Sequence, residues 1–184
     1  MSFIFKQLRI PDVISITPYL FNDERGYFFE NFKHSAFKQH QIDLNFIQEN
    51  FSKSKKNVIR GLHFQKNPKA QAKLVTAVSG EIFDVAVDLR KNSSTFGKWV
   101  GEILSEINHK SLYVPKGFAH GFCVLSEGAT VMYKINQEYS PDHEQGIVWN
   151  DPDIAISWPI SEPIISEKDQ NLPLFKNQDY DFNP

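Results

Sequence analysis

Cysteine is almost missing from this sequence. Cys123 is the only one among 184 residues, so neither an internal disulfide nor a zinc site built from cysteines can form. Chains without disulfides are typical of reducing compartments, and on this basis we expect a cytoplasmic protein.

A surplus of either charge is missing as well. The 20 lysines and arginines nearly balance the 22 aspartates and glutamates, which gives a formal net charge of -2. A general nucleic-acid-binding protein needs a strongly basic face, so we expect no nucleic-acid partner. The balance still permits a local cluster of cations around one small anionic ligand.

Long apolar runs are also absent. None approaches the ~20 residues that a membrane-spanning helix needs, so we expect no membrane partner. Lys6, Arg9 and Pro11 interrupt the first residues, and no small-residue cleavage site follows, which argues against a secretory signal. At roughly 100–200 residues per domain, the length predicts a single domain over residues 1–184, with a loop-rich tail from about residue 151.

The abundant residues are aromatic. They make up 14% of the chain, and 16 of them are phenylalanines. Aromatic and β-branched residues fit the half-buried surface of a sheet, so the composition favours an all-β core. Strand-like segments follow one another at roughly 8–12-residue spacing, which indicates a sandwich or barrel. We predict strands over residues 15–20, 27–32, 58–65, 72–79, 81–90, 99–105, 111–114, 121–125, 130–137 and 146–149, and short helices over 31–42 and 167–170.

The strand predicted over residues 81–90 has one apolar face and one face that carries two acids. Side chains alternate between the faces of a strand, so Asp84 and Asp88 share a face with Ile82 and Ala86. This parity points Asp84 inward and makes it a candidate partner for His120.

The segment from Arg60 to Gln65 places a cation and a histidine in one strand. A single histidine in a strand is more often a packed residue than a catalytic one. Strict alternation puts Arg60 and His63 on opposite faces, and a bulge at Gly61 would bring both inward. Cationic groups that converge on an apolar interior are costly unless an anion is bound there.

Pro115, Gly117 and His120 match the second motif of the cupins, a superfamily of double-stranded β-helices (Pro-x-Gly-x-x-His). Metal-binding cupins usually carry His-x-His and a Glu in their first motif, because three or four ligands must converge on one ion. The corresponding residues here are His63, Phe64 and Gln65, and Phe64 cannot bind a metal. We therefore predict a barrel without a metal.

A longer series of motifs runs from about Ile16 to Leu174. In order, the motifs are Asp23-x-Arg25-Gly26-x-Phe28-x-Glu30, Gln48-x-Asn50-x-Ser52-x-Ser54, Arg60–Gln65, Pro115–Phe122, Tyr133-Lys134, Tyr139-Ser140-Pro141, Glu144-x-Gly146-Ile147, Trp149-Asn150-Asp151-Pro152 and Ser166-Glu167-Lys168-Asp169. The series closely resembles the dTDP-4-dehydrorhamnose 3,5-epimerase family. The one visible departure is Glu49, where members commonly have Asp. The resemblance implies a mainly β fold, a double-stranded β-helix or cupin-like jelly-roll barrel with a few short helices. It also implies a homodimer that works without a cofactor.

The resemblance implies a substrate as well, dTDP-4-keto-6-deoxy-glucose. Its C3 and C5 would be inverted through enolate intermediates to give dTDP-4-keto-L-rhamnose, in the biosynthesis of dTDP-L-rhamnose. Both carbons flank the C4 ketone, so one set of groups can serve both. The chemistry needs a base on one face of the sugar, an acid on the other, and positive charge at the oxyanion.

The same resemblance assigns these roles to four residues. His63 is the base and Asp169 its hydrogen-bonding partner, as in a catalytic triad. Lys73 stabilises the oxyanion, and Tyr133 is the acid, with Tyr139 as the rival for that role. The implied substrate-binding residues are Arg25, Glu30, Gln48, Glu49, Asn50, Arg60, His120, Glu144 and Lys168, of which Arg25 and Glu30 are expected to reach the site of the partner subunit.

Three alternatives stay open at this point. A relative that inverts only C3 or only C5 would carry the same catalytic residues. The presence of these residues therefore does not show how many carbons are inverted. A non-catalytic sugar-nucleotide-binding module would be expected to have lost His63 or Tyr133. A metal-dependent cupin is opposed by Gln65.

Overall fold

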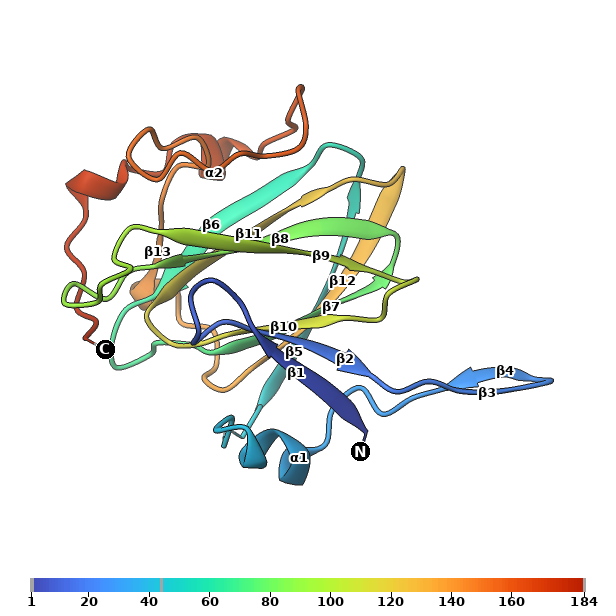
Figure 1. Ribbon diagram of the computed structural model, residues 1–184. Helices are drawn as coiled ribbons and strands as arrows, with labels where there is room; N and C mark the ends of the chain where they lie inside the picture. The colour runs from blue at the N-terminus through green and yellow to red at the C-terminus, as the bar shows by residue number, and fades with distance from the viewer. Residues whose placement is uncertain (1, 44, 184) are drawn as a thin grey trace.

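Two antiparallel sheets face each other and enclose the interior of the molecule (Figure 1). The computed structural model describes residues 2–43 and 45–183. The larger sheet has six strands, in the order β1 (Phe3–Gln7), β2 (Ile14–Pro18), β10 (Ser111–Val114), β7 (Lys73–Ser79), β12 (Gly128–Ile135) and β5 (Gln48–Lys55). The smaller sheet has five, in the order β13 (Glu144–Gly146), β6 (Ile59–Gln65), β11 (Phe118–Val124), β8 (Glu81–Asp88) and β9 (Trp99–Ser105).

The main core lies between the sheets and follows the alternation of side chains. Val75 of β7 packs in one buried cluster with Ile82 and Ala86 of β8. The next residue on β8, Val85, belongs instead to a cluster on the outer face of the smaller sheet. The predicted parity of β8 is therefore confirmed, and Asp84 and Asp88 point inward, each fully buried.

Both outer faces are covered. The tail after β13, orange and red in Figure 1, lies over the smaller sheet, where Tyr180 and Phe182 pack against Val85. Helix α1 (His34–Gln39) lies against the larger sheet, where Phe37 packs against Phe3. Among residues 2–43 and 45–183, no helix is both long enough and apolar enough to cross a membrane.

Most of the predicted strands are present with shifted ends, and three strands were not predicted. These are β1, β5 and β3 (Phe21–Asp23). The strand predicted over 27–32 is only the short β4 (Gly26–Phe28), because its pairing with β3 ends at Phe28. The helix predicted over 31–42 is limited to α1, whereas α2 (Glu167–Gln170) is confirmed. The β3–β4 hairpin projects away from both sheets (Figure 1).

Candidate active site

A bulge in β6 brings Arg60 and His63 to the same side of the strand. Along β11, His120 pairs with His63 and Phe122 pairs with Arg60, so β6 has one residue more than β11 over this stretch. Gly61 supplies it with a φ of 123°, and a Cβ there would lie 2.6 Å from the Cα of Gly121. The sequence therefore needs glycine at this position, and the predicted bulge is confirmed.

Two adjoining cavities open in the interior beside this bulge. His63, Lys73 and Tyr133 line both of them. The first lobe, about 230 Å³, is also lined by Gln48, Asn50, Phe64, Gln65, Gln71, Ile135, Tyr139 and Glu144. The second lobe, about 310 Å³, is also lined by Ser52, Arg60, His120, Phe122, Ser166, Lys168 and Asp169. The four predicted catalytic residues thus meet at one place.

His63 is held by a carboxylate from the tail. Its Nε2 lies 2.8 Å from Oδ1 of Asp169, and Oδ2 of Asp169 accepts the backbone N–H of Gly61 at 3.0 Å. Ser166 caps α2 by accepting the N–H of Asp169, which fixes the direction of the carboxylate. Burial raises the pKa of Asp169, but the hydrogen bond and charge of His63 and the bonds from Gly61 and Ser166 outweigh this and lower it. The predicted contact between Asp169 and His63 is confirmed.

Lys73 is a buried cation at the junction of the lobes, with 8% of its surface exposed. Its Nζ donates one long hydrogen bond, 3.5 Å, to the backbone oxygen of His63. Burial lowers the pKa of Lys73 to about 8, although the charges of Asp84 and Glu144 act in the opposite direction. An ammonium has three N–H donors, so Lys73 keeps donors for an oxygen inside the cavity.

The two candidate acids differ in what they contact. Tyr133 lines both lobes, and its hydroxyl makes no hydrogen bond within residues 2–43 and 45–183. Burial raises the pKa of Tyr133, so its phenol is protonated. Tyr139 is 52% exposed, and its hydroxyl donates to Oε2 of Glu144 at 2.7 Å. The geometry therefore favours Tyr133 as the acid.

The predicted binding residues on the lobes form a polar rim. Lys168 donates to Oε2 of Glu144 at 2.7 Å and links α2 to β13. Gln48 and Asn50 bond to each other at 2.9 Å on β5, and Arg60 donates to Ser54 at 2.9 Å. His120 lies deeper and bonds through Nε2 to Oδ1 of Asp84 at 2.7 Å, as its parity predicted.

Three predicted binding residues do not reach the lobes of their own chain. Glu49 lies on the opposite face of β5 from Gln48 and Asn50 and forms an ion pair with Lys134. Arg25 lies on the β3–β4 turn with 90% of its side chain exposed, and it pairs with Asp23. Glu30 pairs with Lys33 outside the sheets.

Ser52 and Ser166 belong to the motifs named above but were not predicted as site residues, and both line the second lobe. Alternation along β5 places Ser52 on the same face as Asn50 and would have indicated it, had that strand been predicted. Gln65, which stands where metal-binding cupins have a second histidine, holds backbone groups of the neighbouring loops. Its buried amide donates to the backbone of Lys69 and Glu138 and accepts from Ser140. Within the described residues, no group of three or more His, Cys, Asp or Glu side chains converges to hold a metal ion.

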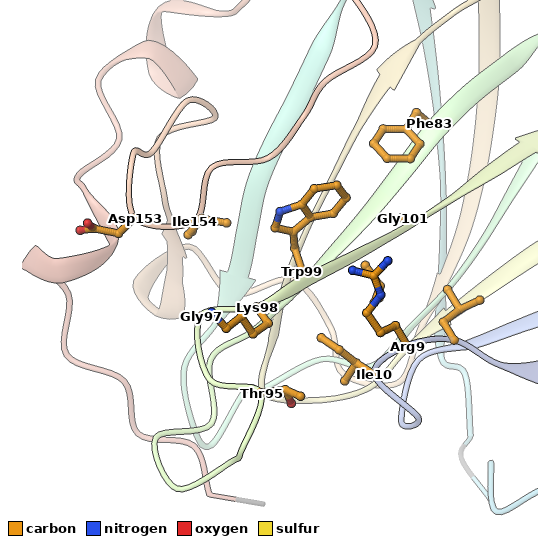
Figure 2. Close-up of a pocket in the computed structure, with 12 residues that line it drawn as sticks. Arg9, Ile10, Phe83, Thr95, Gly97, Lys98, Trp99, Gly101, Asp153 and Ile154 are labelled. Carbon is orange, nitrogen blue, oxygen red and sulfur yellow. The ribbon is translucent and has the colours of Figure 1, made fainter.

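A larger cavity, about 660 Å³, lies elsewhere, between the tail, the segment before β2 and the outer side of β9. Trp99 and Phe83 supply aromatic surface (Figure 2). The acid there, Asp153, points away from Arg9 in this view. The cavity therefore lacks converging catalytic groups, and the two lobes are the better candidate for the active site.

Known proteins resemble this chain over nearly its whole length. A family model described as dTDP-4-dehydrorhamnose 3,5-epimerase matches residues 7–177. The dTDP-4-dehydrorhamnose 3,5-epimerase of Shigella flexneri is 52% identical over 172 residues, 93% of this chain and 95% of that protein. The crystal structure of the same enzyme from Bacillus anthracis str. Ames with TDP and PPi bound has a TM-score of 0.92 and 48% identity, covering 95% of this chain and 100% of that one. The crystal structure of dTDP-6-deoxy-D-glucose-3,5-epimerase from Legionella pneumophila Philadelphia 1 in complex with dTDP-4-keto-L-rhamnose has a TM-score of 0.93 and 44% identity, covering 96% and 95%. These matches confirm the predicted cupin-like, mainly β fold.

Proposed function

The chain belongs to the dTDP-4-dehydrorhamnose 3,5-epimerase family, and we propose that it inverts C3 and C5 of dTDP-4-keto-6-deoxy-glucose to give dTDP-4-keto-L-rhamnose. One observation carries the proposal: a carboxylate-paired imidazole, a buried ammonium and an unbonded phenol face one cavity. Such groups can take a proton from a carbon beside a ketone and return one from the other face. Because the family model spans residues 7–177, we take the chain to act as one catalytic domain.

His63 is the base in this proposal. A carboxylate can only accept a hydrogen bond, so Asp169 keeps a proton on Nε2 of His63 and leaves the lone pair on Nδ1. That nitrogen removes the proton from C3 or C5. A base positioned in this way contributes roughly 10²–10⁴-fold to the rate.

Lys73 stabilises the enolate that results. Its free N–H donors meet the C4 oxygen as that oxygen gains negative charge. Loss of one donor of this kind typically costs roughly 2.7–4 kcal/mol of transition-state stabilisation. The reaction moves protons only, so it needs no redox cofactor.

Tyr133 returns a proton on the face of the ring opposite His63. The two residues belong to different sheets, β12 and β6, and line the same two lobes. A sugar ring held between them presents one face to each side chain. This arrangement supports inversion rather than simple exchange of the proton.

The rim of the two lobes supplies the groups that a nucleoside diphosphate needs. Arg60 and Lys168 place two cations at the second lobe, where the planar fork of the arginine can bind two phosphate oxygens. Gln48, Asn50 and Glu144 line the first lobe and offer donors and acceptors to the nucleoside. His120 serves the sugar because it lies deepest.

We propose a homodimer, in which the β3–β4 hairpin of one subunit completes the site of the other. Phe21, Tyr27 and Phe28 on this hairpin are 59%, 57% and 66% exposed, and large exposed apolar groups mark an interaction surface. Arg25 at the turn would bring a further cation to the partner's nucleotide. Glu30 follows on the same segment.

Incubation with dTDP-4-keto-6-deoxy-glucose in D₂O tests the function directly. We expect deuterium at both C3 and C5 by NMR, together with inverted configuration at both carbons. Deuterium at only one carbon would replace the proposal with a mono-epimerase, and no exchange at all would exclude the enzymatic function.

The variant His63→Asn provides the control for the base. It should abolish exchange while binding of dTDP, measured by calorimetry, stays largely intact. Exchange at the wild-type rate in this variant would show that another group removes the proton.

A further inference from the structure

Asp84 is a charged side chain in the core that the proposed mechanism leaves unused. It lies on β8 between Ile82 and Ala86, with no exposed surface. Oδ1 accepts from Nε2 of His120 at 2.7 Å. Oδ2 has no partner, and only one other buried side-chain atom in the described part of the chain shares this property, the hydroxyl of Ser52.

A carboxylate in this position is costly unless nearby positive charge or donors compensate for it. The second inward acid of β8 shows the usual solution. Asp88 is equally buried but accepts hydrogen bonds from Arg90, Ser93 and Thr95. Asp84 has one histidine, His120, in place of such a network.

His120 connects Asp84 to the second lobe. It pairs with His63 on the neighbouring strand and lines the lobe with Lys73 and Tyr133. Because Asp84 occupies Nε2, a substrate can meet only the Nδ1 nitrogen of the ring. Burial lowers the pKa of His120, and the charge of Asp84 opposes this only in part, so the ring is neutral and Nδ1 carries a lone pair.

We infer that Asp84 is a positioning residue for the proposed reaction. It fixes the tautomer of His120, so that Nδ1 accepts a hydrogen bond from a hydroxyl of the sugar, and it places a buried negative charge behind the His120 ring, which shares the second lobe with Lys73 and so favours the ammonium form of that lysine. The expected effect on the rate rests on the proposed function. The tautomer of His120 and the charge of Lys73 do not depend on it.

The charge of Lys73 depends on all the groups around the lobes. The acids are Asp84 on β8, Glu144 on β13 and Asp169 on α2. The cations and titratable groups are Arg60 and His63 on β6, His120 on β11, Tyr133 on β12, Tyr139 after β12 and Lys168 on α2. Each acid has one side-chain partner among these groups: Glu144 bonds to Lys168, Asp169 to His63 and Asp84 to His120. Asp84 is the acid whose second oxygen is unpaired within the described residues.

The first test uses the wild-type protein without substrate. Nitrogen NMR of ¹⁵N-histidine-labelled protein, with His120 assigned by its loss in His120→Gln, reports the tautomer directly. We expect the proton on Nε2 and an unprotonated Nδ1 near neutral pH. A proton on Nδ1 with Nε2 bare would overturn the inference.

The second test compares two buried acids of one strand. Asp84→Asn removes the charge and keeps the size, and Asp88→Asn is the matched control because its charge faces Arg90 instead of the lobes. The measurement is an NMR pH titration of ¹³C-lysine-labelled protein, in which the Lys73 signal is assigned by its loss in Lys73→Met. We expect the titration midpoint of Lys73 to lie near pH 8 in wild type. It should fall by about 1 pH unit or more in Asp84→Asn and stay unchanged in Asp88→Asn.

The kinetic consequence follows from that shift. We take the Lys73 titration midpoint of Asp84→Asn to lie about 1 pH unit below that of wild type. The ratio of kcat in Asp84→Asn to kcat in wild type should then be roughly fivefold lower at pH 8 than at pH 6. A merely structural role would lower kcat equally at both pH values. An unmoved Lys73 midpoint in folded Asp84→Asn would overturn the inference. If that variant does not fold, the tautomer of wild-type His120 decides. Both NMR measurements are made without turnover, so they remain decisive even if the chain shows no epimerase activity.

Discussion

Among single residues, Lys73 is expected to set the alkaline limit of the proposed activity. Burial lowers its pKa to about 8, and only the protonated form can stabilise an enolate oxygen. We therefore expect kcat to fall as the pH rises through about 8, and to drop about tenfold for each further unit. Initial rates between pH 6 and 10, with circular dichroism to verify folding, check this. A rate that stays level to pH 10 would mean that Lys73 does not act as a cation.

Tyr133 and Tyr139 can be separated by single substitutions. In Tyr133→Phe, His63 can still take a proton and return it to the same face, so deuterium should enter with retained configuration while epimerisation falls roughly 10²-fold or more. In Tyr139→Phe the lost hydroxyl had bonded to Glu144, so epimerisation should continue with a raised KM. NMR of the product in D₂O distinguishes exchange from inversion. Loss of inversion in Tyr139→Phe alone would reverse the two roles.

At the scale of elements, the bulge of β6 determines whether Arg60 and His63 share a side. Gly61 and Gly26 have nearly equal φ values, 123° and 126°, but a Cβ at Gly26 meets nothing within 4 Å, whereas one at Gly61 meets the β11 backbone at 2.6 Å. Gly26→Ala should cost only the backbone strain, roughly 1–3 kcal/mol. Gly61→Ala should lose clearly more stability in urea unfolding, and its folded fraction should lose exchange activity because β6 and β11 separate. Equal losses in the two variants would show that the close approach is unimportant.

Strand β5 shows why part of the fold was not predictable from the sequence. Its inward residues, Gln48, Asn50 and Ser52, are polar because they line the active-site lobes. The outward ones include Phe51, which is 61% exposed. The usual alternation of apolar and polar residues is therefore reversed, and a rule based on apolar cores cannot find the strand. Strand β8, whose outer face is buried beneath the tail, was found easily.

Some features of the site could be predicted from single strands, and others only from the family resemblance. Alternation showed that Arg60 and His63 could both face inward only with a bulge at Gly61, and it pointed Asp84 inward, since both statements follow from the geometry of one strand. The bond between His63 and Asp169 joins residues 106 positions apart, and only the family resemblance suggested it. Glu49 was assigned to the site from the family resemblance, but a motif cannot indicate which of two adjacent residues faces the cavity. The parity of β5 gives that answer once the strand is known.

For the whole molecule, a net charge of -2 conceals a concentration of charge at one end of the interior. Arg60, Lys73 and Lys168 gather there from three separate elements. Acids accompany the catalytic groups, and the tail delivers Asp169 by folding back over β6. The position of Arg25 does not fit this pattern in a single subunit, because the hairpin carries it away from the lobes (Figure 1).

A mixing experiment decides whether Arg25 serves the partner subunit. Arg25→Ala alone should weaken substrate binding roughly tenfold or more, and His63→Asn alone should be inactive. In a hybrid dimer of the two variants, the subunit with intact His63 faces a partner with intact Arg25, so one of its two sites is complete. Random exchange of subunits makes about half of the dimers hybrids, which predicts about a quarter of wild-type activity at a substrate concentration that leaves Arg25→Ala almost inactive. If Arg25 acted within its own chain, neither subunit of the hybrid would hold a complete site, and mixing would restore nothing. The recovered fraction, measured after co-refolding of equal amounts, therefore reports which subunit each arginine serves.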